Sequence, residues 1–386
     1  MKIAMIGQKG IPAHAGGIER HVEELSKMLV SQGHEVMVFC RGWYAKAQDN
    51  YHGIRCIETP CIKTKHLDAI THTFTAILRA AREQVDVFHI HGVGPALLAW
   101  LPKLLRPSAK VIVTFHCVDR HHQKWNAFAR LMLWLGEWMA CRMPDATIVV
   151  SKTLQAYCQK QYNTRAIYIP NGAHIPLEDA DPVYLKDYEL KPDEYLLMCS
   201  RLVRHKGAHT FIKAWKLLRE QSPTLAGQKK LAIVGGSAFT EDYIRELHTL
   251  AQNDDSIVFT GTQTGPVLHA LFRFSYAVVH PSESEGLPIA VLEAMGYGKC
   301  VLSSDIPENR ELTDEAGLTF KTNDVEDLAE RLKMLLEHPD LVKAVGAEAR
   351  TYVASRYDWR DIAQKTSYLY EISCMEPFVE KQAPSA

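Results

Sequence analysis

Residues 276–311 constrain the fold most strongly, because they read as a strand, a tight loop, a helix and a second strand in close succession. The run 276–280 is short, apolar and β-branched, as in a buried strand. A helical pattern then runs from Pro288, a residue suited to the first helical position, to Gly296, and residues 300–303 form the second strand. This succession is typical of a parallel α/β sheet.

The first turn of the predicted helix is a candidate anion site. Free N–H groups and the positive end of the helix dipole bind anions there without a dedicated side chain. Glu285 precedes the helix and Glu293 lies inside it. Carboxylates repel a phosphate but accept hydrogen bonds from hydroxyl groups, so the pair predicts a ligand that joins a phosphate to a sugar. The alternative is an ordinary helix with one acidic residue before it and one solvated glutamate.

The sequence Glu285-Gly-Leu-Pro-Ile-Ala-Val-Leu-Glu293-Ala-Met resembles the paired-glutamate motif of family 4 retaining glycosyltransferases, which have the GT-B fold. The resemblance implies that Glu285 contacts hydroxyls of a donor sugar and that Glu293 holds the ribose of its nucleotide. It further implies that the backbone of Gly286, Leu287 and Pro288 holds the donor around the sugar and the diphosphate. The implied donor is a nucleotide-diphosphate sugar.

Strands and helices alternate along the chain, and 386 residues suffice for two domains. This alternation predicts βαβ units, parallel sheets and ligand binding at the carboxyl ends of the strands. The resemblance implies two Rossmann-like domains that face each other across a deep cleft. The predicted strands are residues 3–6, 35–39, 85–90, 111–115, 146–150, 195–199, 231–236 and 257–262, and the predicted helices include 18–31, 70–82, 128–141 and 210–219.

The segment Tyr168-Ile-Pro-Asn-Gly172 ends the first half and resembles the hinge signature of the family. We therefore expect an acceptor-binding domain over residues 1–172 and a nucleotide-sugar-binding domain over residues 173–356. A helix over residues 357–374 is expected to cross back to the N-terminal domain. Residues 375–386 read as a disordered tail.

Composition and cysteine usage indicate where the protein works. Hydrophobic residues at 47% and charged residues at 23% are typical of a soluble globular protein. The nine cysteines show no disulfide or metal-binding spacing, which indicates a reducing compartment. The apolar run 1–7 is too short for a signal peptide, and no window of about 20 apolar residues predicts a membrane span. We expect a cytoplasmic protein that can bind peripherally at the inner face of the membrane.

Charge is unevenly distributed between the two halves. Residues 1–170 contain 21 basic and 12 acidic side chains, an excess of nine positive charges, and the remainder has an excess of ten negative charges. The basic half favours an anionic partner such as an acidic membrane surface or a lipid-phosphate acceptor. The alternative is a charge asymmetry without a role. The helix near residues 125–142, rich in Leu, Met and Trp, is expected to pack in the core rather than on a membrane.

A glycine-containing loop, residues 7–17, follows the first predicted strand. Its spacing is not that of a dinucleotide fingerprint, and no acidic residue ends the second strand, so a dinucleotide ligand is disfavoured. Gly16 and Gly17 permit close approach of the backbone to a ligand. The resemblance implies that this loop contacts the donor diphosphate, and the alternative is a structural turn.

Histidines mark the ends of two predicted strands. His89 and His91 are two residues apart, a spacing that suits a metal, but no third ligand is evident and we predict no metal site. His116 follows another strand within Thr114-Phe-His116. This matches the family pattern Thr-x-His, which implies a histidine beside the donor sugar near the reacting centre. The alternative is a histidine of the core.

The residues after His116 are candidates for acceptor binding. Asp119, Arg120 and Trp125 provide charge and an aromatic surface. With the opening GQKGIPAHAGGIERHVEEL, they resemble a bacterial subset that includes rhamnosyltransferases of surface polysaccharide synthesis. That subset has glycine where this chain has Cys117. The resemblance points to rhamnose on a deoxythymidine carrier.

Arg201 and Lys206 follow the predicted strand 195–199 and suit a diphosphate, because arginine offers a planar fork and lysine a mobile charge. They match the family pattern R-x4-K-G, which neutralises the leaving nucleotide diphosphate. Arg204 between them is expected to be solvated, and the alternative for the whole segment is a basic surface loop. The resemblance places the base near Thr262 and the donor near Gly235.

Together these features resemble a retaining enzyme that moves a hexosyl or deoxyhexosyl group to a saccharide or lipid-linked acceptor by front-face attack. The implied catalytic residues are His116, Glu285, Arg201 and Lys206. Because the two cations replace Mg²⁺ at the diphosphate, we expect no cofactor, no required metal and no nucleic-acid partner. Two alternatives stay open: a nucleotide-sugar epimerase, which needs no acceptor, and a non-catalytic subunit that only binds the donor.

Overall fold

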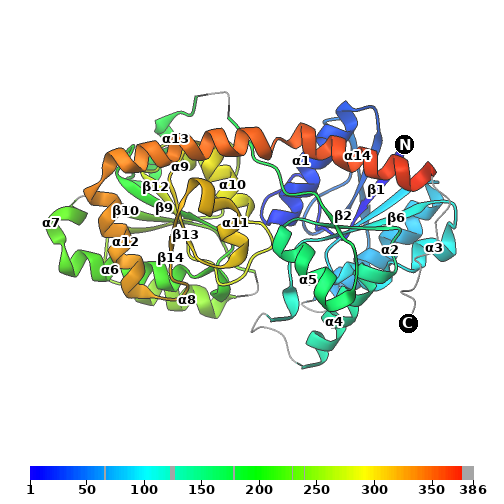
Figure 1. Cartoon of the computed structure of the whole chain (residues 1–386), viewed down its shortest axis with the longest axis horizontal. Helices are drawn as coiled ribbons and strands as arrows, with labels where there is room; N and C mark the ends of the chain where they lie inside the picture. The colour runs from blue at the N-terminus through cyan, green and yellow to red at the C-terminus, as the bar shows by residue number, and fades with distance from the viewer. Residues whose placement is uncertain (65–66, 122–126, 177–178, 228, 239, 376–386) are drawn as a thin grey trace. The chain divides into compact units, whose positions relative to one another are not determined.

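The computed structural model describes residues 1–64, 67–121, 127–176, 179–227, 229–238 and 240–375 (Figure 1). The chain divides into two compact units. Unit 1 contains Met1–Ala13, Ile18–Pro170 and the C-terminal segment from Trp359, and unit 2 contains His14–Gly17 and Asn171–Asp358. Within the described residues, no helix is both long and apolar enough to cross a bilayer.

Unit 1 is built on an eight-stranded sheet in the order β3-β4-β2-β1-β5-β6-β7-β8. All neighbouring strands are parallel except β3, which runs antiparallel to β4. Ile3 lies opposite Val36 on one side and Val87 on the other, so β1 is central and its side chains are buried. The strands are β1 (Lys2–Ile6), β2 (Glu35–Arg41), β3 (Gln48–Tyr51), β4 (Ile54–Thr59), β5 (Val87–His91), β6 (Lys110–Phe115), β7 (Ala146–Val149) and β8 (Ile167–Tyr168).

The helices of unit 1 bury one face each against this sheet. Helix α5 shows how local sequence sets the ends: Ser151 caps its first turn by accepting from the Leu154 amide at 3.2 Å, and Asn163 ends it in a left-handed conformation. The C-terminal helix α14 adds Trp359 and Tyr370 to the core of unit 1. The helices are α1 (Gly17–Ser31), α2 (Asp68–Arg82), α3 (Leu101–Leu105), α4 (Ala127–Arg142), α5 (Lys152–Tyr162) and α14 (Trp359–Met375), with 3₁₀ turns η1 (Pro95–Leu98) and η2 (Asp119–His121).

Unit 2 contains a six-stranded sheet, entirely parallel, in the order β11-β10-β9-β12-β13-β14. Leu196 of β9 lies opposite Leu231 and Ala277, which makes β9 and β12 the central pair. The strands are β9 (Tyr195–Cys199), β10 (Lys230–Val234), β11 (Ile257–Gly261), β12 (Ala277–His280), β13 (Val301–Ser304) and β14 (Leu318–Phe320). The helices are α6 (Ala208–Gln221), α7 (Pro223–Ala226), α8 (Glu241–Leu250), α9 (Gly265–Arg273), α10 (Ile289–Gly296), α11 (Pro307–Ala316), α12 (Val325–Glu337) and α13 (Pro339–Arg356), with η3 (Pro182–Tyr188) and η4 (Arg204–Lys206).

The strand orders fix where each unit can bind a ligand. In unit 1 the order reverses between β1 and β5, and in unit 2 between β9 and β12. Connections leave for opposite faces of the sheet at such a point, so a crevice forms outside the carboxyl ends of the two strands. The loops after β1 and β5, and those after β9 and β12, are therefore the places to look for functional side chains.

One expectation about packing is wrong. Helix α4 was expected in the core, but it buries only its small and acidic residues Gly136, Glu137, Ala140 and Cys141. Its large apolar side chains are exposed instead: Phe128, Leu131, Trp134 and Trp138. The buried side of the helix packs tightly at Gly136, where a Cβ would lie 2.2 Å from the Val93 carbonyl oxygen.

Candidate functional site

The loops that follow β9 and β12 lie against each other at the switch point of unit 2. The Glu283 amide donates to the His205 carbonyl at 2.7 Å, which joins the two loops directly. Gly207 has a φ of +76°, and a Cβ on it would lie 2.0 Å from the Pro281 carbonyl oxygen. Only glycine fits this contact, because the position requires both a left-handed backbone and no side chain.

Glu285, in the loop after β12, accepts three hydrogen bonds on a single carboxylate oxygen. Its Oε1 receives Nζ of Lys206 at 2.5 Å, Nε2 of His280 at 2.7 Å and Oγ of Ser282 at 2.6 Å. No described residue donates to the second oxygen, Oε2. This atom is not among the buried side-chain atoms that lack a partner, so it is accessible. The arrangement holds the carboxylate rigidly through one oxygen and leaves the other to accept from a ligand hydroxyl.

The charge of Glu285 is fixed by these partners. Burial by itself would raise the pKa of this carboxyl, but the Lys206 charge and the hydrogen bonds from His280 and Lys206 outweigh burial and hold its pKa well below the usual value. The side chains of Lys206 and Glu285 are only 14% and 9% exposed. Glu285 is therefore a constant acceptor rather than a proton donor near neutral pH.

The two arginines beside Lys206 differ in their contacts. Arg201 is half-buried, and among the described residues no carboxylate lies within ion-pair distance of it. Arg204 pairs with Glu246, and its guanidinium lies 5.0 Å from the centre of the Tyr243 ring. Arg204 is exposed, as expected, but its guanidinium is already engaged by Glu246 and Tyr243. Arg201 and Lys206 are the cations that can meet an anion at this edge.

Helix α10 begins one residue later than predicted. Pro288 has an extended ψ of 111° and occupies the capping position, so the first helical residue is Ile289. Asn171 Nδ2 donates to the Leu287 carbonyl at 2.7 Å and fixes the loop in front of the helix. The amides of Val291 and Leu292 donate to the Pro288 carbonyl at 3.1 and 3.2 Å, whereas those of Ile289 and Ala290 have no acceptor among the described residues and can bind an anion near the Lys206–Glu285 pair.

Two predicted donor residues belong to unit 2: Gly16, just before α1, and Gly17, the first residue of that helix. Gly16 has a φ of +107°, which favours glycine, and a Cβ on Gly17 would lie 3.8 Å from Cδ1 of Ile289 in α10. The glycine loop is held by carboxylates of α1, because Glu19 accepts from the Lys9 amide at 3.0 Å and Glu23 from the Ala13 amide at 2.7 Å.

The remaining donor candidates lie at neighbouring loops of the same sheet edge. A Cβ on Gly235 would lie 1.8 Å from the Ser200 carbonyl oxygen, so the loops after β9 and β10 are in contact. A Cβ on Gly236 would lie 2.4 Å from Oγ1 of Thr262, which brings in the loop after β11. Glu293 is half-buried inside α10, and its charge adds to desolvation in raising the pKa of Cys199, a half-buried residue at the end of β9.

His116 lies just past β6 in unit 1 and contacts other histidines. Its Nε2 is 3.1 Å from Nδ1 of His91, the last residue of β5. His21 of α1 stacks edge-on against His116, with ring centres 4.9 Å apart. Burial, and then the neighbouring His21 and His89, lower the pKa of His116 well below its usual value, so its ring is neutral.

The acceptor candidates near His116 have contacts inside unit 1. Asp119 accepts from Sγ of Cys117 at 3.3 Å. Arg120 donates to Oη of Tyr157 at 2.8 Å and lies 3.5 Å from the fully buried Glu137. These contacts indicate a structural role for Arg120, whose charge neutralises that of Glu137. Trp125 lies outside the described residues.

Two sequence profiles of known families match this chain. Residues 15–175 match Glycosyltransferase Family 4, and residues 184–352 match Glycosyl transferases group 1. The chain is a glycosyltransferase. An uncharacterized glycosyltransferase of Methanocaldococcus jannaschii is 24% identical over 97% of this chain and 98% of its own length.

Solved structures show that this glycosyltransferase has the GT-B fold. Sucrose-phosphate synthase of Thermosynechococcus elongatus is similar with a TM-score of 0.80, at 22% identity, over 96% of this chain and 98% of that one. HepE of Anabaena, in complex with UDP-glucose, is similar with a TM-score of 0.77, at 18% identity, over 96% of this chain and 100% of that one. The expected fold class and enzyme class are thereby confirmed.

Three polar residues of the glycosyltransferase were not singled out from the sequence. His280 and Ser282 donate hydrogen bonds to Glu285. The sequence feature that could have identified them is their position between the end of a strand and the first glutamate of the motif. Asn171 anchors the loop before α10, and it was assigned only to a hinge. Their function depends on contacts with residues up to 116 positions away, which spacing does not show.

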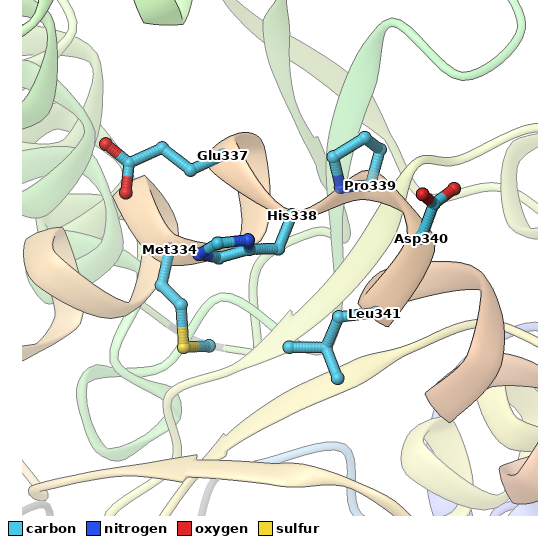
Figure 2. A pocket seen from close by; sticks show the side chains of 6 residues that line it. All are labelled: Met334, Glu337, His338, Pro339, Asp340 and Leu341. Carbon is cyan, nitrogen blue, oxygen red and sulfur yellow. The ribbon is translucent and has the colours of Figure 1, made fainter.

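A surface pocket of the glycosyltransferase lies at the turn between α12 and α13 (Figure 2). The carboxylates of Glu337 and Asp340 point to opposite sides of His338, so they do not form an acid–base pair. None of the candidate site residues lines this pocket, whose lining consists of Met334, Glu337, His338, Pro339, Asp340 and Leu341.

Proposed function

We propose that this chain is a retaining glycosyltransferase that moves a hexosyl or deoxyhexosyl group from a nucleotide-diphosphate sugar to a saccharide or lipid-linked acceptor. We place the reaction in bacterial surface polysaccharide synthesis. The carrying observation is the carboxylate of Glu285, which is held through Oε1 by Lys206, His280 and Ser282 while Oε2 accepts nothing from the described residues. Such a group suits a sugar hydroxyl and repels a phosphate.

Donor binding is assigned to unit 2. Arg201, Lys206 and the first-turn amides of α10 supply positive potential for the diphosphate at the carboxyl ends of β9 and β12. The half-buried Glu293 is assigned to the ribose, Thr262 to the region of the base, and Gly235 to donor binding. HepE of Anabaena was solved with UDP-glucose, which supports a nucleotide sugar as the ligand class.

Transfer requires negative charge on the departing diphosphate to be stabilised, and Arg201 and Lys206 are placed to do so. We assign retention to front-face attack, in which acceptor and diphosphate share one face of the sugar, with His116 of unit 1 contributing near the reacting carbon. A glycosidase-like double displacement needs a nucleophilic carboxylate at about 5 Å from an acid partner. Glu285 is instead held as a hydrogen-bond acceptor.

We propose that the reaction needs no metal, because two cations and a helix N-terminus serve the diphosphate. Transfer is expected to proceed at an unchanged rate in EDTA. Loss of activity in EDTA with recovery in Mg²⁺ would show that the cations do not replace a metal.

The donor is tested first by thermal shift with a panel of UDP-, GDP- and dTDP-sugars, including dTDP-rhamnose. A ligand at 100 times its dissociation constant stabilises the folded state by about 2.7 kcal/mol, so the true donor raises Tm visibly. NMR of the product then reports its anomeric configuration. Retention of the donor configuration is expected, and inversion contradicts the proposed chemistry.

Two alternative functions make different predictions with the same reagents. A nucleotide-sugar epimerase converts its donor with no acceptor present. A non-catalytic subunit binds the donor but shows neither transfer nor hydrolysis. The transferase is expected to consume donor in proportion to acceptor, apart from slow hydrolysis.

We propose in addition that unit 1 binds peripherally to an anionic membrane surface from the cytoplasmic side. Phe128, Leu131, Trp134 and Trp138 are 69%, 53%, 43% and 37% exposed, and their spacing of three to four residues places them on one face of α4. The excess of nine positive charges in residues 1–170 complements anionic lipid.

Vesicle co-sedimentation tests this contact. The protein is expected to sediment with phosphatidylglycerol vesicles at low salt and not with phosphatidylcholine vesicles. Leu131→Glu should abolish binding, whereas Phe74→Glu, at an equally exposed position of α2, should not. Equal binding by both variants contradicts the role of α4.

A further inference from the structure

Three buried histidines of unit 1 converge on one point. His21, His91 and His116 come from α1, from the end of β5 and from the residue after β6, and they are 3%, 1% and 7% exposed. One ring nitrogen of each lies within 4.8 Å of the other two. Nδ1 of His91 and Nε2 of His116 are 3.1 Å apart.

The neighbouring His89 does not belong to this group. Its Nδ1 lies 2.5 Å from Oη of Tyr370 and its Nε2 lies 2.6 Å from Oγ1 of Thr114, so both ring nitrogens are engaged. His89 packs against His91 with ring centres 4.1 Å apart and limits how the His91 ring can turn. The second nitrogen of His91 faces Sδ of Met5 at 3.4 Å, which leaves Nδ1 directed toward His116.

The dimensions of the cluster match three imidazoles around a tetrahedral ion. Nitrogens bound at about 2.05 Å in tetrahedral geometry lie about 3.3 Å apart, and the ring centres then lie about 5.2 Å apart. The observed ring-centre separations are 5.6 Å for His21–His91, 4.9 Å for His21–His116 and 5.4 Å for His91–His116. Three nearly equal separations are expected of ligands that share a centre.

We propose that His21, His91 and His116 form a three-histidine site for a divalent transition metal ion, of which Zn²⁺ is the expected occupant. Imidazole nitrogen suits zinc, copper and nickel, and not magnesium or calcium, which require oxygen ligands. Three protein ligands leave a fourth position for water. His91 and His116 are buried, and imidazole binds a metal ion in its neutral form.

The site has a consequence for activity, which rests on the proposed function of His116. An ion on His116 withdraws its ring nitrogen from the transfer reaction. Zn²⁺ is therefore an inhibitor of an enzyme that needs no metal, and a chelator restores the rate. Metal binding itself is measured without substrate, so its outcome is independent of the transferase assignment.

Co²⁺ is the probe for binding, because tetrahedral Co²⁺ absorbs visible light much more strongly, and at longer wavelength, than octahedral Co²⁺ in water. The chelator-treated full chain is titrated with Co²⁺ and then with Zn²⁺. One Co²⁺ per chain with tetrahedral bands is expected, and Zn²⁺ should remove the bands. His21→Gln and His91→Gln should each weaken binding at least about 100-fold, since removal of a ligand costs more than loss of an outer-shell partner.

His34→Gln is the matched control, because His34 lies in the same unit, is partly buried and is not in the cluster. It should bind Co²⁺ as the unsubstituted chain does. No tetrahedral bands, or equal binding by His21→Gln and His34→Gln, overturns the proposal. If the cluster variants do not fold, crystals of the unsubstituted chain soaked in Zn²⁺ decide: an anomalous peak at about 2.0–2.1 Å from the three nitrogens supports the site, and no peak there overturns it.

Discussion

Nζ of Lys206 lies 2.5 Å from Oε1 of Glu285, and the two residues come from the loops after β9 and β12, the strands that flank the switch point of unit 2. One contact thus joins the cation assigned to the diphosphate with the anion assigned to the sugar. Because His280 and Ser282 also donate to Oε1, we expect Glu285 to keep its position if Lys206 turns toward a ligand.

Glu285→Gln keeps the size of the side chain and removes its charge. We expect kcat to fall about 10²–10³-fold, as when one preorganised polar group is removed from an active site. Arg204→Ala removes an exposed cation three residues from the glycine turn at Gly207, and we expect less than about a three-fold change. Steady-state kinetics with the identified donor measures both. Equal losses in the two variants contradict the distinct role given to Glu285.

Arg201→Ala and Lys206→Ala are expected to weaken binding of the nucleoside diphosphate. A hydrogen bond to a charged group contributes about 1.5–3 kcal/mol, so Kd should rise about 10- to 100-fold in each variant. Isothermal titration calorimetry with the free nucleoside diphosphate measures this directly. Arg204→Ala is the control and should bind as the unsubstituted chain does. Unchanged affinity in Arg201→Ala would show that the diphosphate does not bind at this loop.

Gly207→Ala tests the contact between the loops after β9 and β12. The new Cβ would lie 2.0 Å from the Pro281 carbonyl oxygen, at a φ of +76°. We expect a loss of stability of more than about 1–3 kcal/mol, because the clash adds to the backbone strain. Gly265→Ala shares a positive φ of +57° but has nothing within 4 Å, so it isolates the strain alone. Urea unfolding curves compare them, and similar losses would show that the clash is relieved at no cost.

Lys299 makes stability depend on pH in the alkaline range. Burial lowers its pKa to about 8 in the folded chain, against about 10.4 in the unfolded chain. Between these pKa values the unfolded chain binds more protons than the folded chain. Lys299 therefore increases the free energy of unfolding as pH rises, by at most about 1.4 kcal/mol per pH unit. Lys299→Met should remove that gain between pH 8 and pH 10.5. Lys343→Met, at an exposed position, should not; parallel pH curves for all three proteins contradict the prediction.

The order of strands and helices was largely predictable, because hydrophobic periodicity and β-branching are local signals. Strand β9 begins and ends at the predicted residues, and α1 differs by one residue. The hairpin of β3 and β4 was missed, since the exposed Gln48–Tyr51 has no apolar pattern. Helix α4 was expected in the core because its composition is apolar, but composition does not tell which face meets the sheet.

The sequence identifies candidate residues for the site but not the contacts among them. The motif identifies Glu285, and the strand order then places it next to Lys206, 79 positions earlier. That His280 and Ser282 would hold one oxygen of its carboxylate depends on side-chain geometry. Likewise, His89 and His91 suggested a metal pair without a third ligand, whereas His21 and His116 come from other elements. Spacing along one strand cannot show such convergence.

Helix α14 belongs to unit 1 although it is made last. Its Tyr370 is fully buried, with Oη 2.5 Å from Nδ1 of His89, and Trp359 joins the same core. During synthesis the continuous stretch Asn171–Asp358 can therefore fold before unit 1 is complete, because unit 1 also requires the later helix α14. A nascent chain that stops at Asp358 lacks the Tyr370 partner of His89 and the Trp359 side chain of the same core, so we expect unit 1 to complete its folding only after α14 has been synthesised.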